Sequence, residues 1–215
     1  MTTTAPTPHR RVPVRWIAAA AIAALVVLMA VSTEYRTAET VASATARKAF
    51  DPAAFGAQNY RAKVVPAIQS AAVDLPVLLQ ALAADKDAAG QKYGKRQGTG
   101  PYTFAVKGTG KAGAARSGLL PVTVEDLPDD TRVSLQIGPA INGTALRDAA
   151  GFITFGQFTN QVEYADAATA LNNQMRDELL KGLDVAALDG KEISFVGAFT
   201  LLTPKTVTIT PVAIT

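Results

Sequence analysis

The chain has 215 residues, of which 48% are hydrophobic, so it can bury one sizeable core and is too apolar for general disorder. It contains no cysteine, and its single histidine is His9; disulfides, thiolate catalysis and a histidine base beyond residue 9 are therefore excluded. The net charge is +3, and residues 1–32 hold three arginines and no acidic residue, so the rest of the chain is balanced. We therefore predict no metal site, no cofactor and no nucleic-acid partner.

The first 33 residues have the pattern of a membrane-targeting segment. Arg10, Arg11 and Arg15 precede an uninterrupted apolar run, Trp16–Val31. As a helix this run spans roughly 24 Å at about 1.5 Å per residue, against about 30 Å for the hydrocarbon core, so two further residues make a marginal span. We predict a cytoplasmic basic tail at residues 1–15 and a transmembrane anchor or signal segment at residues 16–33.

Two alternatives follow for the cellular location. A retained anchor gives a single-pass inner-membrane protein with its C-terminal domain in the periplasm. A signal peptide, with Ala30 and Ser32 at the −3 and −1 positions of the cleavage site, gives a protein secreted to the periplasm. Both alternatives keep the arginines in the cytoplasm and place the chain after the apolar segment outside, because the positively charged flank of such a segment stays on the cytoplasmic side.

The next part of the chain is alanine-rich and predicts helices. Residues 34–50 lack apolar periodicity and predict a stalk, whereas residues 51–97 predict a small helical subdomain. Asp51 before a proline marks one helix start, Asp74 a second, and Asp85 or Asp87 a third. The apolar positions at helical spacing are Val64, Val65, Ile68, Ala72, Leu75, Leu78, Leu79 and Leu82.

Residues 98–215 predict an α+β domain with three strands, a helix and two further strands. That order favours an OB-like five-stranded antiparallel barrel with one long helix between the third and fourth strands; an open antiparallel sheet with one covering helix is the alternative. Pro211 indicates an edge or a bulge in the last strand. The predicted strands are Tyr102–Lys107, Gly118–Val124, Arg132–Ile137, Lys191–Thr200 and Thr206–Ile214, and the helix runs from Asn160, with Glu163 in a capping box, to about Lys181.

The glycine-rich stretch Gly108–Gly113 matches the dinucleotide-binding pattern GxGxxG. That mechanism needs a helix directly after the glycines, so that backbone N–H groups point at the pyrophosphate. Here Gly118 and Pro121 interrupt the following residues. We therefore predict a glycine-rich hairpin and no nucleotide site.

The folded part contains one basic run, Lys92–Arg96. OB folds that bind nucleic acid use a longer basic groove with aromatic side chains. A run this short, in a part of the chain without excess charge, predicts a solvated loop at the junction between helices and barrel.

One polar cluster is the candidate site. Its amides, Arg–Asp pair and tyrosine could bind a polyhydroxylated ligand or a partner, or they could cap helices and hold a long loop. Asp148 and Glu163 would be the acids of a glycan-acting enzyme if they faced each other across a cleft. The residues are Gln136, Asn142, Thr144, Arg147, Asp148, Gln157, Asn160, Glu163 and Tyr164.

Several short motifs together resemble one bacterial family, called domain of unknown function 2291 and described as predicted periplasmic lipoproteins. The motifs are Lys92–Gly94, Leu135–Pro139, Gly143–Asp148, Phe158–Gln161, Glu163–Asp166, Gly190–Lys191 and Gly197–Phe199. The resemblance implies a helical subdomain with an OB-like domain, and a genomic setting beside sugar ABC transporters of the ribose type. It carries over no catalytic residue. Without cysteine this chain cannot be a lipoprotein, so any membrane attachment must come from the apolar segment.

From these observations we predict a membrane-tethered extracytoplasmic accessory or binding protein that is not an enzyme. Its predicted partners are the inner membrane and components of a carbohydrate ABC transport system. The alternative is a glycan-acting periplasmic enzyme that uses Asp148 or Glu163.

Overall fold

The computed structural model describes residues 14–32, 49–128, 130–203 and 205–215. The chain divides into two units, residues 1–49 and 50–215. In the first unit, helix α1 (Val14–Ser32) includes residues 16–32 of the predicted anchor or signal segment. Most of the predicted basic tail and stalk lies outside the described residues.

The predicted transmembrane anchor is not supported. Among the residues that the structure describes, no helix is both long enough and apolar enough to cross a membrane.

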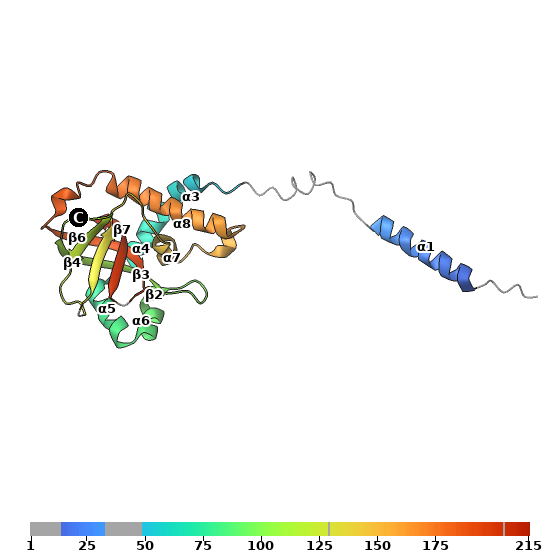
Figure 1. The fold of residues 1–215 in the computed structure, drawn as a ribbon, viewed down its shortest axis with the longest axis horizontal. Helices are drawn as coiled ribbons and strands as arrows, with labels where there is room; N and C mark the ends of the chain where they lie inside the picture. The colour runs from blue at the N-terminus through green and yellow to red at the C-terminus, as the bar shows by residue number, and fades with distance from the viewer. Residues whose placement is uncertain (1–13, 33–48, 129, 204) are drawn as a thin grey trace, which may run out of the picture. The chain divides into compact units, whose positions relative to one another are not determined.

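The second unit is built on a barrel of five main strands (Figure 1). Pairing follows the order β3–β4–β5–β7–β6, and β6 closes the ring by pairing with β3 along nine residue pairs. The predicted OB-like barrel is confirmed, but the prediction of antiparallel pairing throughout is wrong, since β5 and β7 run parallel. A closed ring with an odd number of strands cannot alternate direction all the way round. The strands are β3 (Thr103–Ala112), β4 (Leu119–Thr123), β5 (Arg132–Gln136), β6 (Glu192–Thr200) and β7 (Thr206–Ile214).

Two further strands of two residues each flank β3 and were not predicted. β1 (Val73–Asp74) pairs with it in parallel, and β2 (Gly94–Lys95) pairs with it in antiparallel fashion. Such short strands show no alternation of polar and apolar residues, so a sequence pattern cannot indicate them.

The glycine-rich stretch lies in and just after β3, and the next element is strand β4, as the hairpin prediction requires. The glycines permit close contact between chain segments. A Cβ atom at Gly108 would lie 2.8 Å from the Phe195 ring, and one at Gly110 would overlap the carbonyl oxygen of Thr123.

We expect Gly110→Ala to lower the free energy of unfolding by about 1–3 kcal/mol, because the added methyl group forces β3 and β4 apart. Denaturant unfolding of the full chain measures this change. The control is Gly156→Ala, where a Cβ atom meets nothing within 4 Å and the change should stay within about 0.5 kcal/mol. Equal effects at the two positions would show that the close contact does not matter.

Helices from residues 52–93 pack on the barrel and share its core. Asp51 caps α3, accepting a hydrogen bond from the Ala54 N–H at 3.0 Å, and Asp85, not Asp87, caps α6. Ile68, Leu75 and Leu78 are fully buried in one cluster with Phe104 of β3. The elements are α3 (Pro52–Asn59), a π-helical turn (Tyr60–Val64), α4 (Val65–Ala71), α5 (Leu75–Ala84) and α6 (Lys86–Tyr93).

The connection between β5 and β6 contains the predicted helix, α8 (Gln161–Met175), which continues through a π-helical turn to Leu180. It lies beside α3 (Figure 1), and its buried face includes Ala168, Leu171 and Met175. The Asn160 side chain caps it by accepting the Glu163 N–H at 2.9 Å. The Glu163 carboxylate accepts from the Thr159 N–H instead of that of Asn160, so the capping box is displaced by one residue.

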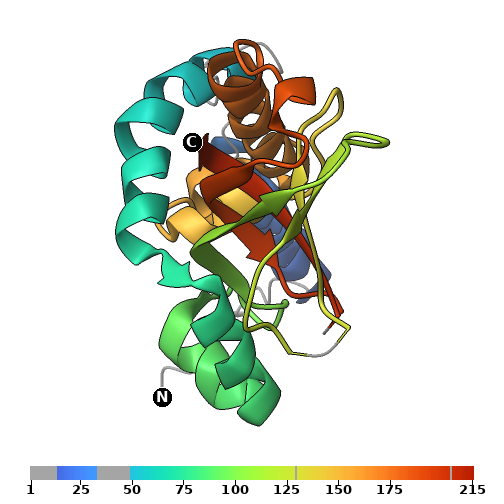
Figure 2. The same cartoon turned by 90° about the vertical axis from the view of Figure 1, so that its left-hand side faces the viewer.

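The last strand, β7, is part of the barrel wall and pairs with β5 on one side and β6 on the other, so it is not an edge strand (Figure 2). Pro211 pairs with Gly197 where the β6–β7 register shifts, so of the two predicted settings it occupies the bulge. A Cβ atom at Gly197 would lie 2.5 Å from the carbonyl oxygen of Thr210, which explains a glycine at this position.

Candidate functional site

Arg147 is at the centre of the predicted polar cluster, on the short helix α7 (Ala145–Ala150). Its side chain is 8% exposed. Its Nε donates to Asp148 Oδ1 at 2.8 Å, and its Nη1 donates to the carbonyl oxygen of Tyr164 at 2.9 Å. The guanidinium carbon lies 3.5 Å from the centroid of the Tyr164 ring, a cation–π contact. The arginine therefore ties α7 to the first turn of α8.

Asp148 completes this network. Its second oxygen, Oδ2, accepts a hydrogen bond from Thr144 Oγ1 at 2.6 Å, so both carboxylate oxygens are engaged. Burial raises the pKa of the Tyr164 hydroxyl, while the neighbouring Arg147 charge acts in the opposite direction. The mutual hydrogen bonds of Thr144, Arg147 and Asp148 favour a structural role for Arg147 and Asp148, whereas the Tyr164 hydroxyl is buried without a hydrogen-bond partner among the described residues.

Other members of the cluster form local hydrogen bonds with the backbone of their own loop or helix end. Gln157 Nε2 donates to the carbonyl oxygen of Phe152 at 3.0 Å, and its Oε1 accepts from the Thr154 N–H. Asn160 and Glu163 cap α8 as described above. Glu163 is thus bound to the backbone of its own loop, and Asp148 to a buried arginine.

Gln136, at the end of β5, forms a second network. Its amide nitrogen donates to the Asn142 carbonyl at 3.0 Å and to Thr210 Oγ1 at 2.8 Å, while its Oε1 accepts the Asn142 N–H at 2.8 Å. From the other side, Asn172 of α8 donates to the Gly143 carbonyl at 2.9 Å. The loop after β5 is therefore held from both sides over the outer face of the barrel.

Between this loop and the barrel lies a groove of about 530 Å³, which we call the threonine groove. Along β7, Val207 and Ile209 are buried in the core, whereas the alternate residues Thr206, Thr208 and Thr210 line the groove. These threonines are exposed, half-buried and fully buried in turn, so the groove deepens toward Gln136. Its lining is Ser117, Gly118, Leu119, Gln136, Ala140, Asn142, Gly143, Thr144, Ala145, Thr200, Leu202, Thr203, Thr206, Thr208 and Thr210.

The comparison with family models decides the family. Residues 21–215 match the model described as predicted periplasmic lipoprotein, DUF2291. The chain belongs to this family. The predicted resemblance is confirmed, and the description supports a periplasmic location.

A comparison with solved structures supports the expected fold. The chain resembles the crystal structure of an OB-fold protein from Thermotoga maritima, with a TM-score of 0.61, 22% identity, and coverage of 78% of this chain and 99% of that one. At this identity the likeness establishes the fold alone. A search of curated proteins returned no match.

In this DUF2291 protein the structure brings together only part of the predicted site. Asn142 and Thr144 line the threonine groove, and Arg147 and Asp148 lie behind it, joined to it through Thr144. Neither Asp148 nor Glu163 lines the groove. The sequence reasoning missed the threonines of β7 and the end of β6. The pattern Thr-x-Thr-x-Thr at positions 206–210 was the available indication, because alternate strand residues share a face.

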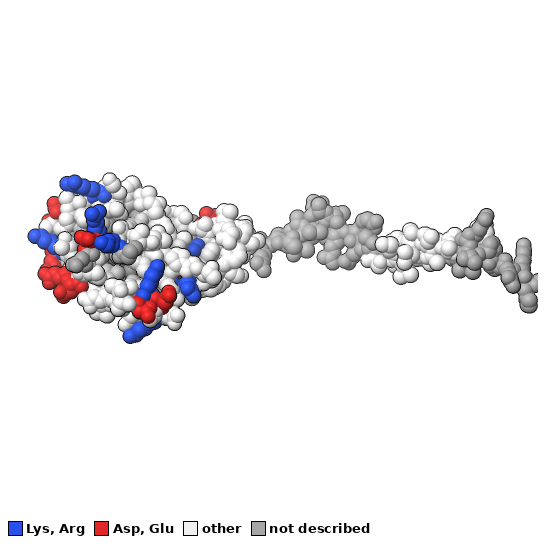
Figure 3. Space-filling model, turned by 60° about the horizontal axis from the view of Figure 1, so that its bottom comes forward, with Lys and Arg blue, Asp and Glu red and all other residues white. Residues whose placement is uncertain are grey.

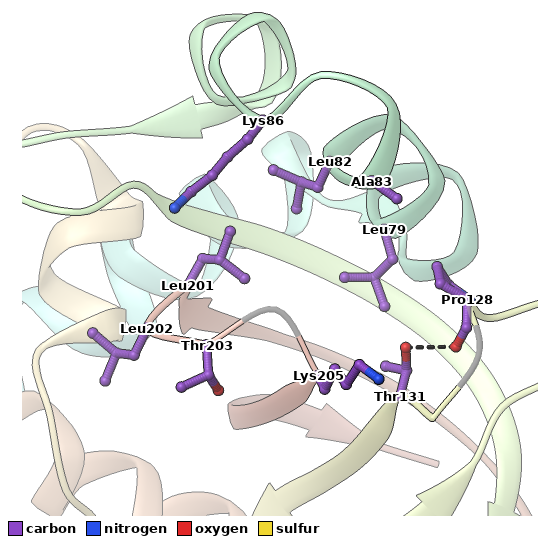
Figure 4. A pocket seen from close by; sticks show the side chains of 10 residues that line it. All are labelled: Leu79, Leu82, Ala83, Lys86, Pro128, Thr131, Leu201, Leu202, Thr203 and Lys205. Carbon is purple, nitrogen blue, oxygen red and sulfur yellow. Dashed lines mark hydrogen bonds between the residues drawn. The ribbon is translucent and has the colours of Figure 1, made fainter.

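A second, smaller pocket adjoins the groove (Figure 4). It measures about 290 Å³, and Leu79 and Leu82 of α5 face Leu201 across it. Leu202 and Thr203 line both hollows, so the β6–β7 loop separates an apolar pocket from a hydroxyl-lined groove. The remaining lining is Ala83, Lys86, Pro128, Thr131 and Lys205.

Charged side chains are interspersed on the face of the compact unit seen in Figure 3. Basic and acidic groups alternate there without a continuous basic stripe. An extended nucleic-acid backbone requires such a stripe, so this face does not suit one.

Proposed function

We propose that this chain is a periplasmic binding module that takes neutral sugars or short oligosaccharides in the threonine groove. The observation that carries the proposal is the chemistry of the lining, which consists of hydroxyl, amide and apolar side chains without an ionisable one. Hydroxyl and amide groups both donate and accept hydrogen bonds, as sugar hydroxyls do.

The position of the groove supports the same ligand class. OB folds bind oligosaccharides and oligonucleotides on their second and third strands and on the loops between the first and second and the fourth and fifth strands. In this barrel those loops join β3 to β4 and β6 to β7, and both contribute lining residues, Gly118 and Thr203 among them. An oligonucleotide needs lysine or arginine for its phosphates, so the uncharged lining favours a saccharide.

A role in carbohydrate uptake follows from this ligand class and from the predicted transport setting. In this proposal the protein acts by binding and not by catalysis, because the groove lining offers no carboxylate, histidine or cysteine. Co-purification with sugar ABC transporter subunits from solubilised membranes tests the partner, and recovery without any such subunit would count against it.

Calorimetric titration of the full chain with D-ribose, D-glucose and maltotriose tests the ligand. We expect Thr208→Val to weaken saccharide binding roughly three- to tenfold, because the isosteric change removes one hydroxyl from the half-buried wall. The matched control is Thr123→Val, an exposed strand threonine outside the groove, which should leave affinity unchanged. Absence of saccharide binding at millimolar concentration, or equal losses for both variants, would contradict the proposal.

A further inference from the structure

Two phenylalanines are exposed on the loop between α7 and α8. Phe152 is 37% exposed and Phe155 43% exposed, while most large aromatic side chains of the compact unit are buried or half-buried. The Phe155 ring packs edge-on against Tyr164, with centroids 5.7 Å apart. The Phe155 ring is therefore held in place at the surface, where part of its apolar area is exposed to water.

The basic run lies against this same loop. The Lys95 stem passes over Gly151, where an added Cβ atom would lie 3.4 Å from Lys95 Cε, and Gln97 Nε2 donates to the Ile153 carbonyl at 3.4 Å. Arg96 lies between them in sequence, with its guanidinium 4.6 Å from the Tyr102 ring centroid. Within the described part of the chain, neither Lys95 nor Arg96 forms an ion pair. The loop with the exposed aromatic rings thus lies against Lys95, and Arg96 follows Lys95 in sequence; neither side chain is paired with an acid among the described residues.

An aromatic series links this surface to the start of the compact unit. Phe50, its first residue, packs against Phe158 with centroids 5.3 Å apart. Phe158 packs against Tyr164 at 5.3 Å, and Tyr164 against Phe155 at 5.7 Å. The folded unit therefore begins at the same aromatic cluster that supports the Phe155 ring.

We infer that Lys95, Arg96, Phe152 and Phe155 form a docking face for an anionic phospholipid surface. Aromatic side chains enter the boundary between headgroups and acyl chains, and nearby lysine and arginine are attracted to anionic headgroups. The charge of the face matches such a surface, and Phe158 and Tyr164 connect Phe155 to Phe50, the first residue of the folded unit. Docking there would leave the threonine groove, which shares none of these residues, open to ligand.

The absence of cysteine allows a direct test with the full chain. A single cysteine introduced by Gly156→Cys, in open space beside Phe155, carries an environment-sensitive fluorophore. Ala187→Cys, an exposed position beyond the far end of α8, carries the control label. Both proteins are reconstituted with vesicles of phosphatidylcholine alone, or of phosphatidylcholine and phosphatidylglycerol at about 3:1, containing a lipid-borne quencher, a mixture whose anionic surface attracts basic segments.

We expect quenching at position 156, not at position 187, and only in the anionic vesicles. Lys95→Glu combined with Arg96→Glu should lower the quenching at position 156 roughly tenfold. About 1 M salt should have the same effect, because it screens the attraction between the basic side chains and the anionic lipids. The double variant Phe152→Ala and Phe155→Ala should abolish the quenching at position 156, while near-UV circular dichroism shows that the fold is intact. An unquenched label at 156 in vesicle-bound protein, or equal quenching at both positions, would overturn the inference. Saccharide titration of the same variants should be unchanged, so failure here is separable from failure of the proposed groove.

Discussion

Replacing Arg147 with alanine is expected to lower the free energy of unfolding by about 3–5 kcal/mol. The change leaves the Asp148 carboxylate, which is 15% exposed, without its cation, and leaves the Tyr164 carbonyl without its donor. A buried charge that loses its partner costs more than the ion pair itself contributes. Urea denaturation of the full chain, followed by far-UV circular dichroism, measures the difference.

The chain offers a matched control in Arg176, which also pairs with the aspartate that follows it. The distance from Arg176 Nε to Asp177 Oδ1 is 3.4 Å, and the two side chains are 39% and 59% exposed. Arg176→Ala should therefore change stability by less than about 1 kcal/mol, since exposed pairs contribute little. A stable Arg147→Ala protein that no longer binds its partner or ligand would instead make the arginine a contact residue.

Leu171→Ala is expected to cost about 2–5 kcal/mol, because it opens a cavity where α8 packs into the core. Leu171 has no exposed surface, and it belongs to the same buried cluster as the barrel residues Val207 and Ile209. Thermal or denaturant unfolding gives the value directly. The midpoint should fall while the slope with denaturant stays unchanged, if only stability is affected.

Val162→Ala is the control on the same helix. Val162 is 68% exposed, so truncation should stay within about 0.5 kcal/mol. Glu178, which lies further along the same helical stretch, is unsuitable because its carboxylate is 3.0 Å from Arg61 Nε. Comparable losses at positions 171 and 162 would show that α8 does not use this face for packing.

Much of the barrel could be predicted because its elements carry local patterns. The last strand, Thr206–Ile214, has the predicted bounds, and the cap at Asn160 begins the predicted helix. Alternation of apolar residues and side-chain caps depends on neighbours in sequence, and these are readable without a structure. Closure of the barrel and the parallel β5–β7 pair depend on contacts between distant segments, which no local pattern contains.

The candidate site shows the same difference between local patterns and contacts of distant segments. The cluster around Arg147 attracted attention because its polar residues are close in sequence, and most of them turned out to satisfy one another. The groove instead combines β7 threonines with Gln136 and Asn142, which are more than sixty positions away. Threonine is common on the outer face of any strand, so its functional position became visible only with the groove.

The sequence by itself indicated the family, an extracytoplasmic location, the five barrel strands with the long helix between the third and fourth, and the absence of cysteine chemistry. The family follows from the resemblance of short motifs, the location from the charge and apolar pattern at the N-terminus, and the barrel strands and long helix from short-range periodicity. Only the tertiary structure decided which polar side chains are satisfied and which line a groove, and that Lys95 lies against the loop of the exposed phenylalanines. The physical reason is that hydrogen-bond satisfaction and exposure depend on every neighbour in space, and most of those neighbours come from distant parts of the chain.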